Sequence, residues 1–355
     1  MVAVIGAHTD LGLQICKALG ADASIGRVVP LAAVGTTERA DVNKSATISP
    51  VKEVDLLQGD IGAALEGVTQ VVHLAPGRSG DLDGTDLDGT GTDGVDVAGT
   101  ARLLTTMSAQ GIDRVVVLSS AMVYGPWPDN PLPLTEAAPR RPHPDLGFAL
   151  RKADIEQRAE EWQDEDVNRS MCLLRPTVTV SLRPDWLSRS LWNAFGVAAE
   201  VEPPVQFLHI DDLVAAVVLA VRTELQGTFN VAPDGWVSGE RIRALAGRQA
   251  RVEVPTKVME RVGALRWITG TTTTPPEVMP YTLEPWVIAN DRMRAAGWEA
   301  TYTNEEAYVS AAPGGPLAML GSQRRQELAL AAVGGVGAAT LAAIGGGVAW
   351  LRRRS

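Results

Sequence analysis

The sequence predicts an α/β protein with a doubly wound parallel sheet and a smaller C-terminal lobe. Short apolar runs alternate with helical segments along the first half of the chain, an order typical of a parallel sheet with helices on both faces. The run at 114–118, RVVVL, is continuously apolar after its first residue, as in strands buried on both sides. Of the 355 residues, 45% are apolar and 21% are charged. This globular composition excludes disorder over the whole length.

The expected elements follow one another in the order strand, helix, strand. Each expected strand is short and rich in β-branched residues, and each expected helix carries apolar residues at helical spacing. From about residue 176 the pattern becomes irregular, with proline-rich loops and scattered helices, which indicates the smaller lobe. The expected strands are 2–5, 27–34, 70–74 and 114–118, and the expected helices are 11–19, 61–65, 97–109 and 148–156.

Charge and the rarer residue types exclude several classes of function. The formal net charge is −10 and no Lys/Arg block occurs before the last residues, so we expect no nucleic-acid partner. Cys16 and Cys172 each lie in an apolar run, which is typical of reduced core thiols and not of a disulfide framework. The four histidines share no ligand spacing, so we expect no metal site.

A glycine-containing turn follows the first expected strand. The segment 6–12, GAHTDLG, places Gly6 and Gly12 six residues apart. In folds that bind a dinucleotide, such glycines allow a tight turn and a close approach of the pyrophosphate to a helix N-terminus. This spacing alone is weak evidence, but further segments follow it: VVHLAP at 71–76, VVVLSSAMVYG at 115–125, LRP at 174–176, QFLHIDDL at 206–213, GTFNV at 227–231 and NDRMRAAGW at 290–298.

In this order and spacing, the segments resemble the extended short-chain dehydrogenase/reductase family, the NAD-dependent epimerase/dehydratases. The resemblance covers about residues 1–305. It implies a Rossmann-type core at 1–175, a substrate lobe at 176–310 that is interleaved with the core, and NAD or NADP as the cofactor. It further implies a small-molecule substrate, a nucleotide sugar or related alcohol, and pairing of two copies into a homodimer.

The resemblance carries over to the cofactor positions with two differences. Gly6 and Gly12 match the outer glycines of the family motif, whereas Thr9 stands at the middle glycine, where a side chain would crowd the pyrophosphate. Ala32 falls near the family's ribose-binding Asp, and no arginine lies beside it. We therefore expect weakened binding of the dinucleotide.

Two further segments match the family's cofactor site. Asp55-Leu56 matches the pair that meets the adenine, and Leu74-Ala75-Pro76 matches the strand end that lines the cofactor. Because these two segments are retained, the resemblance predicts that the cofactor site keeps part of its lining.

The resemblance is most informative at the catalytic positions. The family uses a Tyr as general acid/base and a Lys four residues later, which binds the nicotinamide ribose and lowers the pKa of the Tyr. The Lys matches Lys152, but the Tyr position is Phe148, and none of the four tyrosines has a Lys four residues on. Ser120 matches the hydroxyl that orients the substrate. The alternatives are a surface lysine for Lys152 and a strand-end hydroxyl satisfying nearby backbone for Ser120.

The departures at Thr9, Ala32 and Phe148 leave three hypotheses. The chain is an oxidoreductase or epimerase that moves its proton through Ser120, a water or a substrate group. Or it is a catalytically silent, membrane-tethered protein that binds a dinucleotide or substrate. Or the fold is a scaffold without a nucleotide.

The C-terminal part predicts a membrane anchor. Residues 328–351 form a run of 24 residues without a charge, followed by three arginines, and a helix of that length rises about 36 Å against a hydrocarbon core of about 30 Å. Residues 311–327 read as a linker. A buried Ala/Gly-rich helix is the alternative. Since the N-terminus shows no signal peptide, we expect a cytoplasmic domain anchored to the inner (plasma) membrane by this helix.

Overall fold

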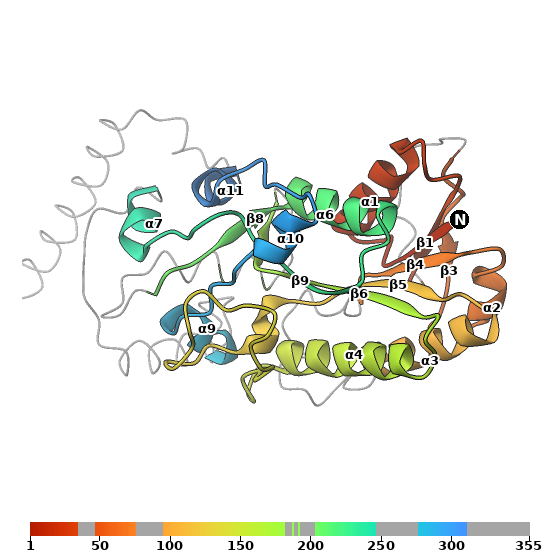
Figure 1. The fold of residues 1–355 in the computed structure, drawn as a ribbon, viewed down its shortest axis with the longest axis horizontal. Helices are drawn as coiled ribbons and strands as arrows, with labels where there is room; N and C mark the ends of the chain where they lie inside the picture. Colours follow the sequence, from red (N-terminus) through yellow and green to blue (C-terminus); the bar gives the residue numbers. More distant parts are fainter. Residues whose placement is uncertain are drawn as a thin grey trace, which may run out of the picture. The chain divides into compact units, whose positions relative to one another are not determined.

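The computed structural model describes residues 1–34, 47–75, 95–181, 187, 191, 203–245 and 276–310. Residues 1–311 form one compact unit. Its centre is a seven-stranded sheet in the order β3-β2-β1-β4-β5-β6-β9, in which neighbouring strands are parallel (Figure 1). Two further strands, β7 and β8, form a small parallel sheet. The doubly wound parallel fold that the sequence predicts is confirmed.

The central strands of the large sheet are short and buried on both faces, which accounts for their apolar sequences. The edge strand β3 is exposed instead, and its two residues are charged. The strands are β1 (Val2–Ile5), β2 (Val28–Ala32), β3 (Lys52–Glu53), β4 (Gln70–His73), β5 (Arg114–Leu118), β6 (Ser170–Pro176), β7 (Val178–Val180), β8 (Phe207–His209) and β9 (Gly227–Val231).

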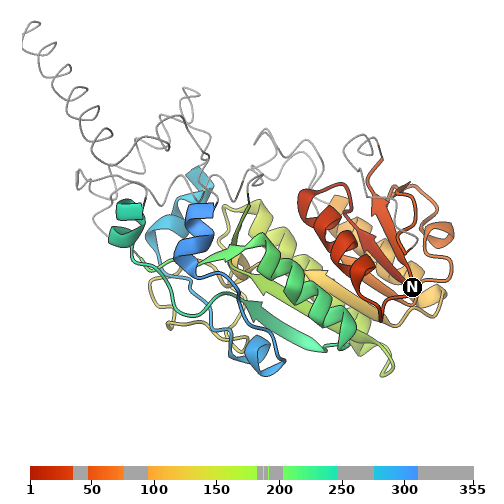
Figure 2. The same ribbon diagram turned by 90° about the horizontal axis from the view of Figure 1, so that it is seen from above.

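Helices cover both faces of the large sheet. One core cluster packs α1 and α6 against one face, and another packs α2, α3 and α4 against the opposite face. Figure 1 shows the two layers above and below the sheet, and Figure 2 shows α1 and α6 lying in front of the strands. The helices are α1 (Asp10–Ala21), α2 (Ile61–Ala64), α3 (Val95–Ala109), η3 (Ala121–Tyr124), α4 (Gly147–Asp164), α6 (Ile210–Arg222), α7 (Gly239–Leu245), η4 (Pro276–Val278), α9 (Pro280–Leu283), α10 (Asp291–Ala295) and α11 (Asn304–Ser310).

A third core cluster joins the C-terminal lobe to the main fold. It packs β7, β8, α9 and α11 against η3, with Phe148 of α4 at its border. After this lobe has begun, the chain returns to the large sheet and adds β9 beside β6. The residues after 176 therefore contribute to both the lobe and the central sheet.

The predicted linker 311–327 and the predicted membrane helix 328–351 lie outside the described residues. Among the helices that the structure describes, none combines the length and the apolar character needed to span a bilayer.

Candidate functional site

The carboxyl ends of β1 and β4 mark the point where the strand order reverses. From β1 the chain builds outward to β2 and β3, and then crosses to β4 on the other side of β1. In open α/β sheets, ligands bind in the crevice outside the carboxyl ends of the strands at this switch point. The predicted cofactor segments 6–12 and 74–76 belong to these two strand ends, although Pro76 lies outside the described residues.

The turn after β1 needs both of its glycines. Gly6 adopts a positive φ of 98°, which favours glycine. A Cβ on Gly12 would lie 2.2 Å from the carbonyl oxygen of Gly6, so only glycine lets α1 approach the turn this closely. These two positions thus form a cradle that a larger residue would fill.

Thr9 occupies the middle of this turn and begins α1 as its N-cap. Its Oγ1 accepts a hydrogen bond from the Gly12 amide at 3.0 Å and donates one to the Gly6 carbonyl at 2.8 Å. The hydroxyl is therefore turned into the loop. The first amides of α1 still lack intrahelical acceptors, so this end of the helix keeps donors for an anion.

Among the described residues, β2 ends in an apolar side chain, and the carboxylate of Asp55 after β3 is engaged in a turn. Ala32, the last residue of β2, is buried. Asp55 follows β3, and its Oδ1 accepts hydrogen bonds from the Leu57 and Gln58 amides at 2.8 and 3.2 Å, so this carboxylate holds a turn. Leu56 lies against α3, where a Cβ on Gly99 would come within 3.0 Å of it.

Lys152 brings the ends of β4 and β5 together. Its Nζ donates to the carbonyl oxygens of Leu74 at 3.2 Å, Ala75 at 3.2 Å and Leu118 at 2.9 Å. The residue is only 6% exposed, so it is not a surface lysine. Ala75 has a positive φ of 43°, which is uncommon for a residue with a side chain. The sequence-predicted residues at these positions thus converge on one ammonium group.

Phe148 lies one helical turn before Lys152 on the same face of α4. The centre of its ring is 5.7 Å from Lys152 Nζ. A phenyl ring has no proton to exchange, and two of the buried tyrosines are committed elsewhere. Tyr124 donates to Asn230 Oδ1 at 2.8 Å, and Tyr281 donates to the Met122 carbonyl at 2.9 Å.

Ser120 is the N-cap of η3 at the end of β5. Its Oγ accepts from the Met122 amide at 3.2 Å, which is the backbone role considered for it. A hydroxyl also carries one proton to donate, and that proton has no acceptor within the described part of the chain. The geometry therefore leaves Ser120 able to donate to a ligand.

His73, the last residue of β4, is a site residue to which the sequence assigned no role. Its Nε2 lies 2.8 Å from Thr100 Oγ1, which donates its own proton to the Asp96 carbonyl at 2.6 Å. The imidazole proton is therefore on Nε2. Nδ1 is buried and has no partner among the described residues. Burial, followed by the nearby Lys152 charge, lowers the pKa of His73 to about 3.

A buried ion pair fixes α4 against the sheet and was also missed. Arg175 at the end of β6 binds both carboxylate oxygens of Glu156 at 2.9 and 2.6 Å. It also donates to Tyr124 at 2.8 Å, and Tyr124 donates to Asn230 of β9. Glu156 lies one turn after Lys152. In the sequence, the position of Glu156 one helical turn after Lys152 was the signal that could have indicated this residue.

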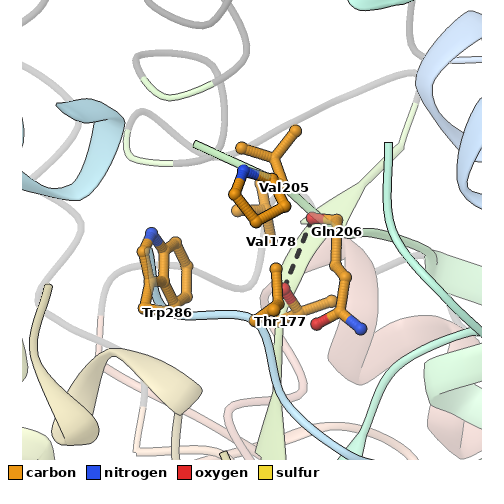
Figure 3. Close-up of a pocket in the computed structure, with 7 residues that line it drawn as sticks. Thr177, Val178, Val205, Gln206 and Trp286 are labelled. Atoms are coloured by element: carbon orange, nitrogen blue, oxygen red, sulfur yellow. Dashed lines mark hydrogen bonds between the residues drawn. The ribbon is translucent and has the colours of Figure 1, made fainter. Parts of the chain in front are cut away.

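A small hollow lies in the lobe, beside Thr177, the residue that follows β6 (Figure 3). The space among its lining residues is about 180 Å³ and is partly open to solvent. A hydrogen bond of 3.3 Å from Thr177 Oγ1 to the Gln206 carbonyl lies at its lining. This hollow is too small for a dinucleotide. Its lining residues are Thr177, Val178, Pro204, Val205, Gln206, Trp286 and Val287.

Within the described ranges, no group of three or more His, Cys, Asp or Glu side chains could hold a metal ion. Cys16 and Cys172 are buried, unpaired thiols. Burial raises the pKa of each to about 12. Neither thiol has the lowered pKa of a reactive cysteine.

The fold and the switch-point site define a dinucleotide-fold α/β protein. The family model of the NAD dependent epimerase/dehydratase family matches residues 2–232, more than half of the chain. The chain belongs to this family. An uncharacterized protein of Mycobacterium tuberculosis (strain H37Rv) is 25% identical over 319 residues, which cover 87% of this chain and 82% of the relative.

Solved structures share the fold at low sequence identity. A Thermus thermophilus UDP-glucose 4-epimerase in complex with NAD aligns with a TM-score of 0.64 at 18% identity, covering 87% of this chain and 97% of that one. A dTDP-glucose 4,6-dehydratase from Streptomyces venezuelae, with NAD bound, aligns with a TM-score of 0.65 at 15% identity, covering 87% and 95%. These similarities concern the fold.

Proposed function

We propose that this chain binds NAD or NADP across the carboxyl ends of β1 and β4 and acts on a nucleotide sugar or a related alcohol. The observation that carries the proposal is the ammonium of Lys152, which is buried where β4 and β5 end. A buried cation at a switch point is suited to anchoring a polar ligand. The cradle of Gly6 and Gly12 at the start of α1 fits the pyrophosphate of a dinucleotide.

Three residues of the chain, Lys152, Ser120 and Phe148, differ in what each can do at this site. When bound, the nicotinamide ring supplies or accepts a hydride. As the family resemblance implies, Lys152 would hold the nicotinamide ribose, its ammonium exchanging one of its three carbonyl partners for a ribose hydroxyl. Ser120 is the hydroxyl that would donate to the reacting oxygen of the substrate. Phe148 cannot move the proton, so the proton passes to water or to a substrate group, or through Ser120.

A catalytically silent, dinucleotide-binding protein is the second candidate, and Phe148 favours it. Loss of a positioned general acid/base costs about 10²–10⁴ in rate. The phenyl ring beside Lys152 Nζ is the physical basis of such a loss. This candidate binds the same ligands and differs only in turnover.

Calorimetric titration of the full-length chain with NAD and with NADP tests binding. Hydride transfer on a panel of nucleotide sugars and alcohols then separates the two candidates. We expect turnover to be lost in Ser120→Ala and kept in the control Ser24→Ala, since Ser24 is exposed and bonded to Asp22 beyond the far end of α1. Binding without turnover would support the silent protein, and absence of binding would refute both.

We further propose that residues 328–351 anchor the chain to the inner membrane, with residues 1–311 in the cytoplasm. The support is the uncharged run of 24 residues and the arginines at 352–354. The homodimer stays a prediction.

A further inference from the structure

His8 lies in the turn between β1 and α1 and reaches the end of β2. The backbone amide of Ala33, the first residue after β2, donates a hydrogen bond to His8 Nδ1 at 3.3 Å. The ring is half-buried. Ala32 beside it is 1% exposed and ends in a methyl group. The imidazole is therefore a polar side chain at the end of β2.

The hydrogen bond from Ala33 fixes the proton of this imidazole. Because Nδ1 accepts, the ring proton is on Nε2. Burial lowers the pKa of His8 below its ordinary value of 6.5, so the ring is neutral near pH 7. No acceptor for the Nε2 proton lies within the described part of the chain. His8 thus presents a fixed, unused donor at this strand end.

We propose that His8 Nε2 donates to the substituent on C2′ of the adenosine ribose, and that the chain therefore prefers NADP over NAD. This assignment rests on the proposed function. In dinucleotide folds, a carboxylate at the end of the second strand holds the 2′-hydroxyl of NAD, whereas a basic group nearby accommodates the 2′-phosphate of NADP. Here Ala32 offers no carboxylate that would repel the phosphate. A donor also bonds more strongly to a charged phosphate than to a neutral hydroxyl.

Two acidic residues of the described structure lie close by: Glu53 of β3, which pairs in register with Ala32, and Asp10. Asp10 begins α1, and its Oδ2 accepts from Gln14 Nε2 at 3.0 Å. Its charge opposes the pyrophosphate, which NAD and NADP share. The His8 variants leave both carboxylates in place, so the change that they cause in the ratio of the two affinities isolates the contribution of His8.

The test is calorimetry of NADP and NAD on the full-length wild-type chain and on three variants. We expect NADP to bind more tightly in the wild type. His8→Leu should weaken NADP about tenfold and NAD by less than about twofold, because only the phosphate makes a charged hydrogen bond. His8→Gln keeps an N–H donor and should keep most of the preference. Ala32→Asp adds the carboxylate and should reverse it.

The outcomes separate this assignment from the proposed function. If the wild type prefers NAD, or if His8→Leu weakens both cofactors equally, His8 does not select the cofactor, while dinucleotide binding stands. If neither cofactor binds the wild type, both proposals are wrong. Circular dichroism checks folding. Should His8→Leu not fold, His8→Ala takes its place: a loss of the NADP preference in that variant supports the assignment, and an unchanged ratio of the two affinities overturns it.

Discussion

Lys152 Nζ lies 5.7 Å from the centre of the Phe148 ring, one turn earlier on α4. A cation near an aromatic face gains about 0.5–2 kcal/mol, more where the pair is desolvated. The ammonium is otherwise bonded to the carbonyl oxygens that end β4 and β5. The pair therefore combines a retained cation with a ring that cannot transfer a proton.

Phe148→Tyr tests whether the pocket has been preserved for chemistry. The new hydroxyl would lie near an ammonium that lowers its pKa. If it is buried without a partner, the change costs about 1–3 kcal/mol of unfolding free energy, which thermal unfolding will measure. We expect no measurable gain in hydride transfer, because Thr9 and Ala32 also alter the cofactor side of the site.

The control for this variant is the double change Phe148→Tyr with Lys152→Met. Any activity that depends on the pair should vanish in the double variant. Robust hydride transfer in the single variant that disappears in the double one would contradict our expectation. It would show that the pocket lacks only the phenol.

The buried ring of His73 leads to a second prediction, which concerns how the free energy of unfolding depends on pH. Its pKa in the folded chain is about 3, whereas an unfolded histidine titrates near 6.5. Between pH 3 and pH 6.5 the unfolded chain binds one more proton than the folded chain. The contribution of the neutral His73 ring to the free energy of unfolding is therefore complete above about pH 6.5 and is lost as the pH falls toward 3. The slope is about 1.4 kcal/mol per pH unit.

His73→Gln removes the titrating ring and keeps an N–H donor for Thr100. Urea unfolding at pH 7 and pH 5 should show that the wild type loses about 2 kcal/mol more than the variant over this interval. Carboxylates and His8 titrate in both proteins, so their contributions cancel. Parallel losses in the two proteins would mean that His73 is already charged in the folded chain.

The central strands could be predicted from the sequence because burial on both faces makes them continuously apolar. The strands β1 and β5 have the predicted bounds. The second strand ends at Ala32, two residues before the predicted end, since Val34 is 61% exposed. The pairing of β9 with β6 was not predicted, because it joins short segments about 50 residues apart through contacts that leave no local pattern.

In the candidate site, too, local relationships could be predicted from the sequence, whereas tertiary contacts could not. The spacing of Phe148 and Lys152 predicted a shared helix face, because helical geometry is local. The three carbonyl partners of Lys152 and the bond between His73 and Thr100 depend on how strands and helices align in three dimensions. No local pattern records that alignment, so these contacts needed the structure.

Thr9→Gly tests whether the first turn meets a phosphate. The variant removes a side chain from the middle of the turn and should tighten dinucleotide binding in calorimetry. Thr9 also caps α1, but replacing an N-cap by glycine costs only a few tenths of a kcal/mol. Thr9→Ser keeps the cap and serves as control. Equal or weaker binding by the glycine variant would show that this turn meets no phosphate.

The segment 328–351 yields the last prediction. Its 24 residues carry no charge and precede three arginines, which gives enough apolar length for a bilayer. Its many glycines and alanines make the run only weakly hydrophobic, so the measurement must distinguish insertion from loose adsorption. We expect full-length protein to sediment with membranes, to resist extraction by alkaline carbonate and to dissolve in detergent. A chain truncated after Pro316 should remain in the high-speed supernatant. Full-length protein in that supernatant without detergent would refute the anchor.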